Sequence, residues 1–256
     1  MKAVILAGGM GTRLREETEF RPKPMVEIGG RPILWHIMKT LSSQGINDFV
    51  VCLGYKGDYI KDFFMNYEAR THDITVKLGK NEGLIQHQES PLENWTVTLA
   101  NTGATTMTGG RIHRIQKYVA GERFLCTYGD GVADIDINAL TNFHKEHGKT
   151  ATITSVRPTN RFGAMQIDEN DLVTEFAEKP VSDKRVNGGY FIFEPSIFNH
   201  LSDESILEKE PLEGLASLGE LKAYMHDGFW QPMDTYRETI ELNELWDTNR
   251  APWKIW

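Results

Sequence analysis

The sequence has few cysteines, no long hydrophobic run and no excess of basic residues, and each shortage excludes a class of protein. Its 2 cysteines, Cys52 and Cys126, stand in apolar, strand-like runs, which predicts buried thiols in a reducing compartment and argues against a disulfide framework. No run approaches the ~18 apolar residues that a membrane-spanning helix needs. The first apolar run ends after about six residues in a glycine loop, too early for a secretory signal. We therefore expect a cytoplasmic protein with no membrane partner.

Charge and composition narrow the class further. The net charge of −8 disfavours nucleic-acid binding, which needs a basic face. Hydrophobic residues make up 40% of the chain and charged residues 25%, as in ordinary globular proteins. No internal repeat or low-complexity linker divides the sequence. We expect residues 1–256 to form a single domain.

Short apolar runs alternate with amphipathic segments along the chain. Strands are expected at 2–7, 49–53, 124–128, 151–156 and 190–193, and helices at 32–45, 54–68, 111–118, 137–147 and 235–246. This alternation predicts an α/β fold whose parallel strands carry helices on both faces. Residues 70–100 are expected to form a loop or hairpin near the ligand, and residues 165–178 a hairpin.

A glycine-rich loop follows the first predicted strand. Three glycines within Gly8–Gly11 leave the backbone open, so that its N–H groups can face phosphate oxygens. Arg13 and Lys23 add the two cations that side chains use to bind phosphate. A P-loop is excluded because no Lys follows Gly11 directly, and a dinucleotide fingerprint because Leu14 replaces its third glycine. The pattern predicts a polyphosphate site, whereas a plain turn would explain only the glycines.

The segments GGMGTRL and RPKP resemble the signature of the sugar-1-phosphate nucleotidyltransferases. Four further segments, HIMK, GYKGDYIK, TYGDGVAD and FWQPMDT, extend the resemblance over essentially the whole chain. The resemblance implies a Rossmann-like fold with a mixed, mostly parallel central sheet flanked by helices. It also implies Mg²⁺ as cofactor and a homo-oligomer, such as a hexamer. By this reading Arg13 and Lys23 are the catalytic residues, which hold the departing phosphates and neutralise charge near the α-phosphate.

Two aspartates are the candidate metal ligands. Asp130 follows a buried strand between two glycines, and Asp234 precedes the last predicted helix. From the residues alone, a turn explains Asp130 as well as a Mg²⁺ ligand does, and a helix N-cap explains Asp234 better. The resemblance favours metal binding, because both residues fall on the family's metal positions. His144 and His147 have a zinc-compatible spacing, but no other Cys or His cluster completes a site, so we expect ordinary helix residues.

The sugar phosphate is expected near a second set of motifs. In the family, an EKP lysine meets the sugar phosphate, and the EKP glutamate and an Asn-Gly pair meet sugar hydroxyls. The residues assigned to the sugar phosphate are Tyr128, Glu178, Lys179, Asn187 and Gly188. An exposed hairpin end with solvated charges is the alternative for the EKP segment.

The base is expected at the segment TTMTGGR. Thr106 and Arg111 offer the hydroxyl and cationic donors that cytosine needs. Relatives that use UTP or dTTP carry a Gln-containing segment here, so the match is nearest to members that use CTP and glucose 1-phosphate. A UTP or dTTP enzyme and a non-catalytic nucleotide-sugar sensor remain alternatives. The residues assigned to nucleotide binding are Leu6, Ala7, Gly8, Gly9, Met10, Gly11, Thr12, Arg13, Lys23, Thr106, Gly110, Arg111 and Gly129.

Overall fold

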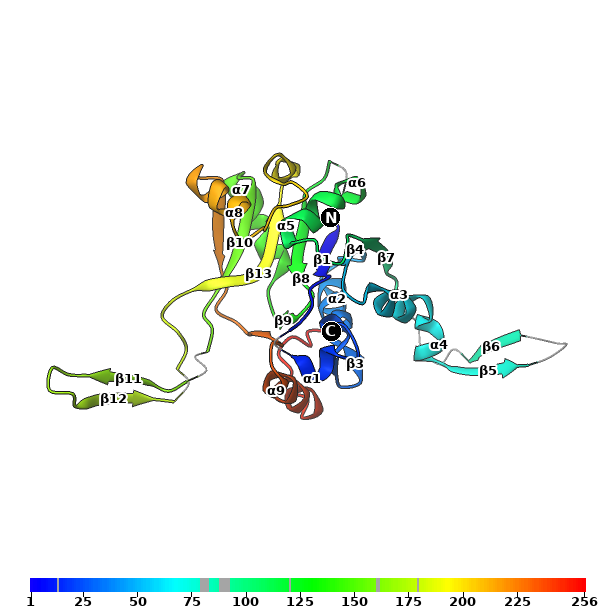
Figure 1. The fold of residues 1–256 in the computed structure, drawn as a ribbon, viewed down its shortest axis with the longest axis horizontal. Coiled ribbons are helices and arrows are strands. Elements are labelled where there is room, and N and C mark those ends of the chain that lie inside the picture. Colours follow the sequence, from blue (N-terminus) through cyan, green and yellow to red (C-terminus); the bar gives the residue numbers. More distant parts are fainter. Residues whose placement is uncertain (13, 79–82, 88–92, 120, 160–161, 179) are drawn as a thin grey trace.

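The computed structural model describes residues 1–12, 14–78, 83–87, 93–119, 121–159, 162–178 and 180–256. At its centre lies a seven-stranded sheet in the order β14-β10-β13-β8-β1-β4-β7 (Figure 1). The strands of this sheet are β1 (Ala3–Ala7), β4 (Asp48–Leu53), β7 (Thr96–Asn101), β8 (Phe124–Tyr128), β10 (Ala151–Val156), β13 (Val186–Phe193) and β14 (Leu221–Met225). Only β13, among these strands, runs against its neighbours. The predicted mixed, mostly parallel sheet is confirmed.

Helices and small two-stranded sheets surround this sheet. The helices are α1 (Arg15–Thr18), α2 (Ile33–Ser43), α3 (Gly57–Met65), α4 (Tyr67–Thr71), α5 (Thr108–Arg114), α6 (Gln116–Val119), α7 (Ile137–His147), α8 (Glu210–Ser217) and α9 (Tyr236–Asp247), with 3₁₀ turns η1 (Lys23–Met25) and η2 (Pro195–His200). The small sheets pair β2 (Glu27–Ile28) with β3 (Arg31–Pro32), β5 (Asp73–Lys77) with β6 (Gly83–His87), β9 (Gly131–Ala133) with β15 (Trp230–Pro232), and β11 (Ala164–Ile167) with β12 (Val173–Ala177).

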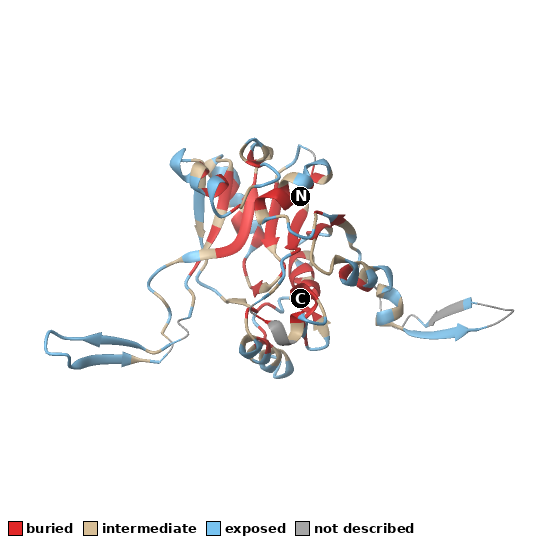
Figure 2. Cartoon of the chain, in the orientation of Figure 1, coloured by how far each residue is buried: buried red, intermediate tan, exposed pale blue. Residues whose placement is uncertain are grey.

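Both faces of the central sheet are covered by hydrophobic residues. Successive side chains of β1 point to opposite faces, so Ile5 belongs to one core cluster and Leu6 to the other. The first cluster contains the buried face of α2 and the fully buried Trp253, and the second contains residues of α5 and α8. Figure 2 shows the resulting buried centre of the molecule. The tryptophan-rich end of the chain thus contributes to the core.

The two thiols behave as the sequence predicts. Cys52 and Cys126 are buried and unbridged. Burial raises the pKa of Cys52 to about 12, so this thiol stays protonated at neutral pH. None of the helices in the described residues combines the length and the hydropathy that a membrane span requires.

Two ribbons, β5–β6 and β11–β12, extend in opposite directions from the central body (Figure 1). The second confirms the hairpin predicted at 165–178. The first confirms a hairpin within 70–100, but the end of this range, β7, instead joins the central sheet beside β4. The position of the hairpin does not support the expectation that it lies near the ligand. The hairpin leaves the body beside α4 and points away from the centre (Figure 1). Its alternating sequence specifies strand pairing and says nothing of the direction in which the ribbon leaves the body.

Candidate active site

The glycine loop lies at the carboxyl end of β1 and borders a cavity of about 440 Å³. The ends of β1 and its parallel neighbour β8 meet here, which is where open α/β sheets bind ligands. Eleven of the residues predicted to bind nucleotide border this one cavity. They are Leu6, Ala7, Gly8, Gly9, Met10, Gly11, Thr12, Lys23, Thr106, Arg111 and Gly129.

The loop has a fixed shape that requires glycine at one position. Gly11 has a φ of +63°, and a Cβ atom there would lie 2.8 Å from the Cγ2 atom of Thr18. The Thr18 hydroxyl donates hydrogen bonds to the carbonyls of Gly11 and Leu14, at 3.1 and 2.8 Å. Because an L side chain rarely adopts this φ and would also clash, Gly11 is needed for the tight turn before α1.

Arg111 is buried beside this cavity and ties three loops together. Its Nη1 atom donates to the carbonyls of Leu53 and Gly103 and to the Thr102 hydroxyl, at 2.8–3.0 Å. Its Nη2 atom donates to the Gly8 carbonyl at 2.9 Å. Burial lowers the pKa of Arg111. The guanidinium therefore holds the glycine loop against the loops after β4 and β7, and contact with a base stays a prediction.

Gly110 was predicted to bind the nucleotide, but it packs against the segment before α8. Its N–H donates to the Ser205 carbonyl at 3.0 Å, and a Cβ atom there would lie 2.2 Å from the Asp203 carbonyl oxygen. The segment before α8 thus packs on Gly110, which explains the glycine by close backbone approach. Its amide is committed to this contact, so the assignment of Gly110 to nucleotide binding is not supported. The predicted residues Arg13 and Lys179 lie outside the described residues.

Lys23 joins the two predicted metal ligands. Its Nζ atom lies 2.6 Å from Oδ2 of Asp130 and 2.5 Å from Oδ1 of Asp234. The Lys23 side chain is only 8% exposed. One cation thus already contacts both carboxylates, so their oxygens converge on a position suited to positive charge. Mg²⁺ prefers this donor set, one or two carboxylates completed by phosphate oxygens and water.

The small β9–β15 sheet brings these aspartates together. It pairs Gly131 with Pro232, and the Met233 N–H donates to the Asp130 carbonyl at 2.8 Å. Thr235, not Asp234, caps α9, through a capping box with Glu238. The helix-cap explanation of Asp234 is therefore wrong, and its carboxylate instead faces Lys23.

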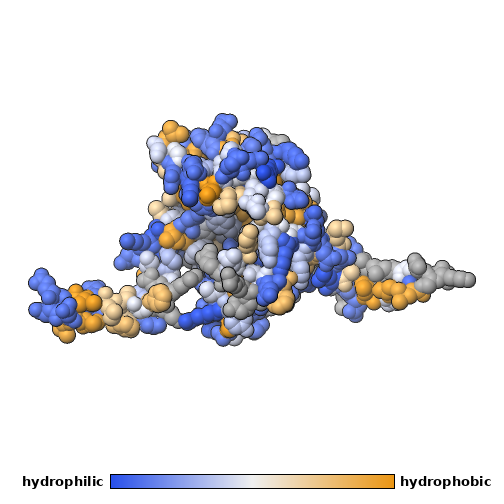
Figure 3. Space-filling view, viewed as in Figure 1, coloured by the Kyte–Doolittle hydropathy of each residue, from blue (hydrophilic) through white to orange (hydrophobic). Residues whose placement is uncertain are grey.

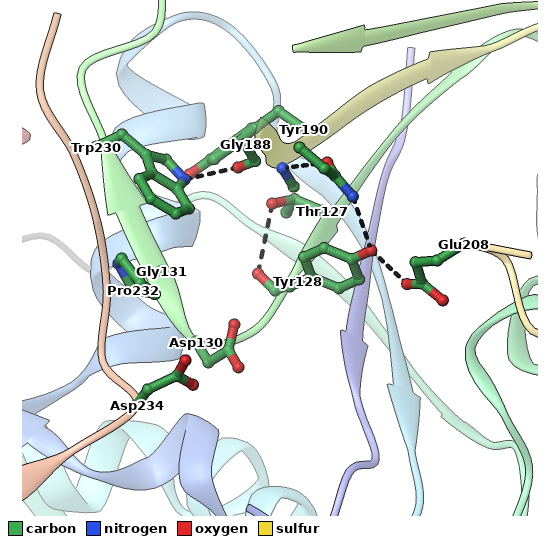
Figure 4. A pocket seen from close by; sticks show the side chains of 12 residues that line it. Thr127, Tyr128, Asp130, Gly131, Gly188, Tyr190, Glu208, Trp230, Pro232 and Asp234 are labelled. Atoms are coloured by element: carbon green, nitrogen blue, oxygen red, sulfur yellow. Dashed lines mark hydrogen bonds between the residues drawn. The ribbon is translucent and has the colours of Figure 1, made fainter. Parts of the chain in front are cut away.

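A second cavity, of about 380 Å³, adjoins the first. Its described lining includes the predicted sugar residues Tyr128, Asn187 and Gly188 together with Asp130 and Asp234 (Figure 4). Tyr128 and Asp130 border both cavities. A ligand in one cavity is thus next to a ligand in the other at the carboxylates.

Glu178 stands apart from this lining. It is exposed at the end of β12, and its Oε2 atom would lie 3.2 Å from a Cβ atom on Gly163. The described lining of the second cavity does not include it. This position matches the alternative of an exposed hairpin end, because Glu178 is exposed at the base of the β11–β12 ribbon.

Several residues of the second cavity were not predicted from the sequence, among them Trp230 and Glu208, whose side chains hydrogen-bond to other lining residues. Trp230 lines it and donates from Nε1 to the Gly188 carbonyl at 2.7 Å (Figure 4). It belongs to the segment FWQPMDT, so its nearness to Asp234 was a usable signal. Glu208 also lines the cavity, and no motif marks it.

The histidine pair is a structural feature of α7. His144 is buried and its Nδ1 lies 2.7 Å from the Thr152 hydroxyl, which also lies 2.7 Å from Nε2 of His147. Burial lowers the pKa of both histidines. Among the residues that can be placed, no group of three or more metal-ligating side chains occurs. The expectation of ordinary helix residues agrees with these contacts.

Comparison with known proteins identifies the family. The family profile for nucleotidyl transferase matches residues 2–231. The chain belongs to the nucleotidyl transferase family. This confirms the family resemblance found in the sequence. Members of this family commonly use a divalent metal ion.

Individual nucleotidyl transferases resemble the chain over its full length. Glucose-1-phosphate cytidylyltransferase of Salmonella typhi is 53% identical over 100% of both chains. A protein of Bacillus subtilis named probable glucose-1-phosphate cytidylyltransferase is 43% identical, also over 100% of both. Among solved structures, HddC from Yersinia pseudotuberculosis has a TM-score of 0.69 at 25% identity, covering 96% of this chain and 99% of its own.

Proposed function

We propose that this nucleotidyl transferase moves the cytidylyl group of CTP to α-D-glucose 1-phosphate, giving CDP-glucose and pyrophosphate. The observation that carries the proposal is the pair of cavities that meet at Asp130, one bordered by the glycine loop and the other by Tyr128 and Asn187. Full-length relatives named glucose-1-phosphate cytidylyltransferase support the choice of substrates.

The proposed reaction is an in-line displacement at the α-phosphorus of CTP. A phosphate oxygen of the sugar phosphate forms the new O–P bond, and the bond from the α-phosphorus to the bridging oxygen breaks as pyrophosphate leaves. The attacking oxygen is already anionic, so no general base is required. Positioning and charge neutralisation then supply the catalysis, as in other phosphoryl-type transfers.

The chain's own residues have distinct proposed tasks. The backbone of Gly8–Gly11 receives the triphosphate, and Lys23 supplies positive charge near the α-phosphate. Tyr128 and Asn187 bind the hexose in the second cavity. The roles of Arg13, on the departing phosphates, and of Lys179, on the incoming phosphate, rest on the sequence motifs.

Asp130 and Asp234 are the proposed ligands of Mg²⁺. Their carboxylates contact one ammonium at 2.5–2.6 Å, which supports a shared cation position. When bound, the ion would supply charge neutralisation between the two phosphate groups. Lys23 must then share these carboxylates with the ion or leave them.

A homo-oligomer is part of the same proposal. The two ribbons expose apolar side chains, and Figure 3 shows hydrophobic residues gathered on both. The exposed residues are Ile74, Val76, Leu78, Met165, Ile167, Leu172, Val173 and Phe176. An isolated two-stranded ribbon is marginally stable in water, so a neighbouring copy that covers these residues would stabilise it. Light scattering after size exclusion should give a mass well above the 29.1 kDa chain; a monomer at micromolar concentration would contradict the proposal.

The enzyme is proposed to act in the cytoplasm. Its two free, buried thiols, Cys52 and Cys126, suit a reducing compartment. Fractionation of the producing cell should recover the protein with cytoplasmic markers, and recovery with secreted or membrane markers would contradict this location.

A pyrophosphate-release assay tests the substrate proposal. CTP, UTP, dTTP, ATP and GTP are each crossed with glucose 1-phosphate and other hexose 1-phosphates in the presence of Mg²⁺. We expect the highest kcat/KM for CTP with glucose 1-phosphate. A preference for UTP or dTTP would overturn the base assignment. Binding of nucleotide sugar without release of pyrophosphate from any pair would favour a sensor.

A further inference from the structure

Glu208 lies between η2 and α8 and borders the second cavity. Its carboxylate accepts two hydrogen bonds from different parts of the site. One comes from the Tyr128 hydroxyl, and the other from the Thr108 hydroxyl, whose oxygen lies 2.7 Å from Oε2. Figure 4 shows Tyr128 pointing toward Glu208 and away from the aspartates. One side chain therefore contacts two separate elements.

Tyr128 connects Glu208 to the second cavity, where the sugar phosphate is proposed to bind. It ends β8, borders both cavities and accepts a hydrogen bond from Nδ2 of Asn187 at 3.4 Å. Burial, together with the negative charge of Glu208, raises the pKa of Tyr128 well above its usual range. The phenol therefore stays protonated and donates to Glu208. Its hydroxyl has a fixed direction only while that acceptor is present.

Thr108 represents the nucleotide side. It begins α5 and borders the first cavity, two residues after Thr106. Its hydroxyl donates to Glu208 and accepts the Leu207 N–H at 2.9 Å. The segment that carries Glu208 is thus fastened to the start of α5, and a shift of either would move the wall of the nucleotide cavity.

We propose that Glu208 is a positioning residue that couples the sugar-phosphate cavity to the nucleotide cavity. The proposal rests on the proposed function. A carboxylate can accept a hydrogen bond on each oxygen, so Glu208 fixes the Tyr128 hydroxyl and the start of α5 in one arrangement. Productive binding of each substrate depends on this shared acceptor.

Removal of the carboxylate should weaken both substrates. Each hydrogen bond to Glu208 has a charged acceptor. Because each substrate is proposed to depend on one of these bonds for its position, the loss of that bond should weaken the binding of that substrate about tenfold. We expect Glu208→Ala to raise KM about tenfold for CTP and about tenfold for glucose 1-phosphate, and to change kcat less. Glu208→Gln keeps one acceptor oxygen, so a smaller increase is expected.

Two double-mutant cycles test the coupling directly. Tyr128→Phe removes the donor on the sugar side, and Thr108→Val removes the donor on the nucleotide side. If Glu208 acts through these hydroxyls, adding Glu208→Ala to Tyr128→Phe should not raise the KM for glucose 1-phosphate further. Adding it to Thr108→Val should not raise the KM for CTP further. Glu210→Gln is the matched control, because Glu210 is exposed two residues along and outside the described linings of both cavities.

The possible results separate this proposal from the proposed function. An increase in only one KM would assign Glu208 to one cavity and overturn the coupling. A lower melting temperature with both KM values unchanged would overturn it as well, because it would indicate a merely structural side chain. Calorimetric Kd values for each substrate alone, in wild type and Glu208→Ala, test the same claim without turnover. A wild type that releases no pyrophosphate contradicts the proposed function, whereas equal Kd values in the two proteins contradict only the role of Glu208.

Discussion

Replacement of Lys23 by methionine tests how the site balances its charges. Methionine has a similar length but leaves Asp130 and Asp234 facing each other without their shared cation. The Asp234 side chain is 11% exposed and that of Asp130 is 34% exposed. Breaking a buried ion pair costs about 3–5 kcal/mol in the free energy of unfolding. Because solvent near Asp130 screens part of this interaction, we expect a loss at the lower end, about 3 kcal/mol. For a chain of this length, each kcal/mol lowers the melting temperature by about 2–4 °C, so a decrease of about 6–12 °C is expected.

The assay is thermal unfolding at fixed protein concentration, first with a chelator and then with MgCl₂. Divalent cations should stabilise Lys23→Met more than wild type, because no ammonium competes for the carboxylates. Lys39→Met is the control, since Lys39 pairs with Glu93 at 3.3 Å in a different ion pair. A Lys23→Met protein that melts within about 2 °C of wild type in chelator, or equal stabilisation of both by Mg²⁺, would refute the reasoning.

Three further predictions concern single side chains. In Arg111→Lys a single ammonium replaces a guanidinium that donates to four acceptors. The KM for CTP should therefore rise about tenfold or more, while the KM for glucose 1-phosphate changes little. Equal increases of the two KM values in initial-rate assays would contradict the role of Arg111 in holding the glycine loop. Gly8→Ala places a Cβ atom 2.2 Å from Nη1 of Arg111 and should reduce nucleotide affinity measured by calorimetry. Gly214→Ala, in α8 with no neighbour within 4 Å among the described atoms, should leave that affinity unchanged. Burial lowers the pKa of His36 in the folded state to about 4, whereas in the unfolded state the pKa of this side chain is about 6.5, so below pH 6.5 the unfolded state binds more protons. The free energy of unfolding should therefore fall by about 3 kcal/mol from pH 7 to pH 4. Denaturant titrations of His36→Gln should show a shallower decrease.

The sequence was most informative where local pattern and function coincide. The apolar run of β1 and the glycines after it predicted the strand, the tight turn and the first cavity, because both a buried parallel strand and a phosphate-binding loop have strict local requirements. The alternation of strands and helices also predicted the mostly parallel sheet. The reversed direction of β13 was beyond this reasoning, since periodicity reports which face is buried and not strand direction.

Contacts between distant segments were harder to predict. Asp130 and Asp234 are 104 positions apart, and the β9–β15 pairing helps to bring them to one ammonium. Arg111 has the residue type of a ligand donor, yet its burial among four protein acceptors is visible only in three dimensions. Glu208 escaped notice because a single glutamate in a loop has no pattern.

The central claim is the choice of CTP and glucose 1-phosphate, and a competition reaction tests it most directly. The enzyme is incubated with equimolar CTP, UTP and dTTP, glucose 1-phosphate and Mg²⁺. The nucleotide sugars formed at early times are separated, and each is identified and quantified by mass spectrometry. Product ratios then equal the ratios of kcat/KM. The account predicts that CDP-glucose predominates. A mixture dominated by UDP-glucose or dTDP-glucose, or the absence of any nucleotide sugar, would contradict it.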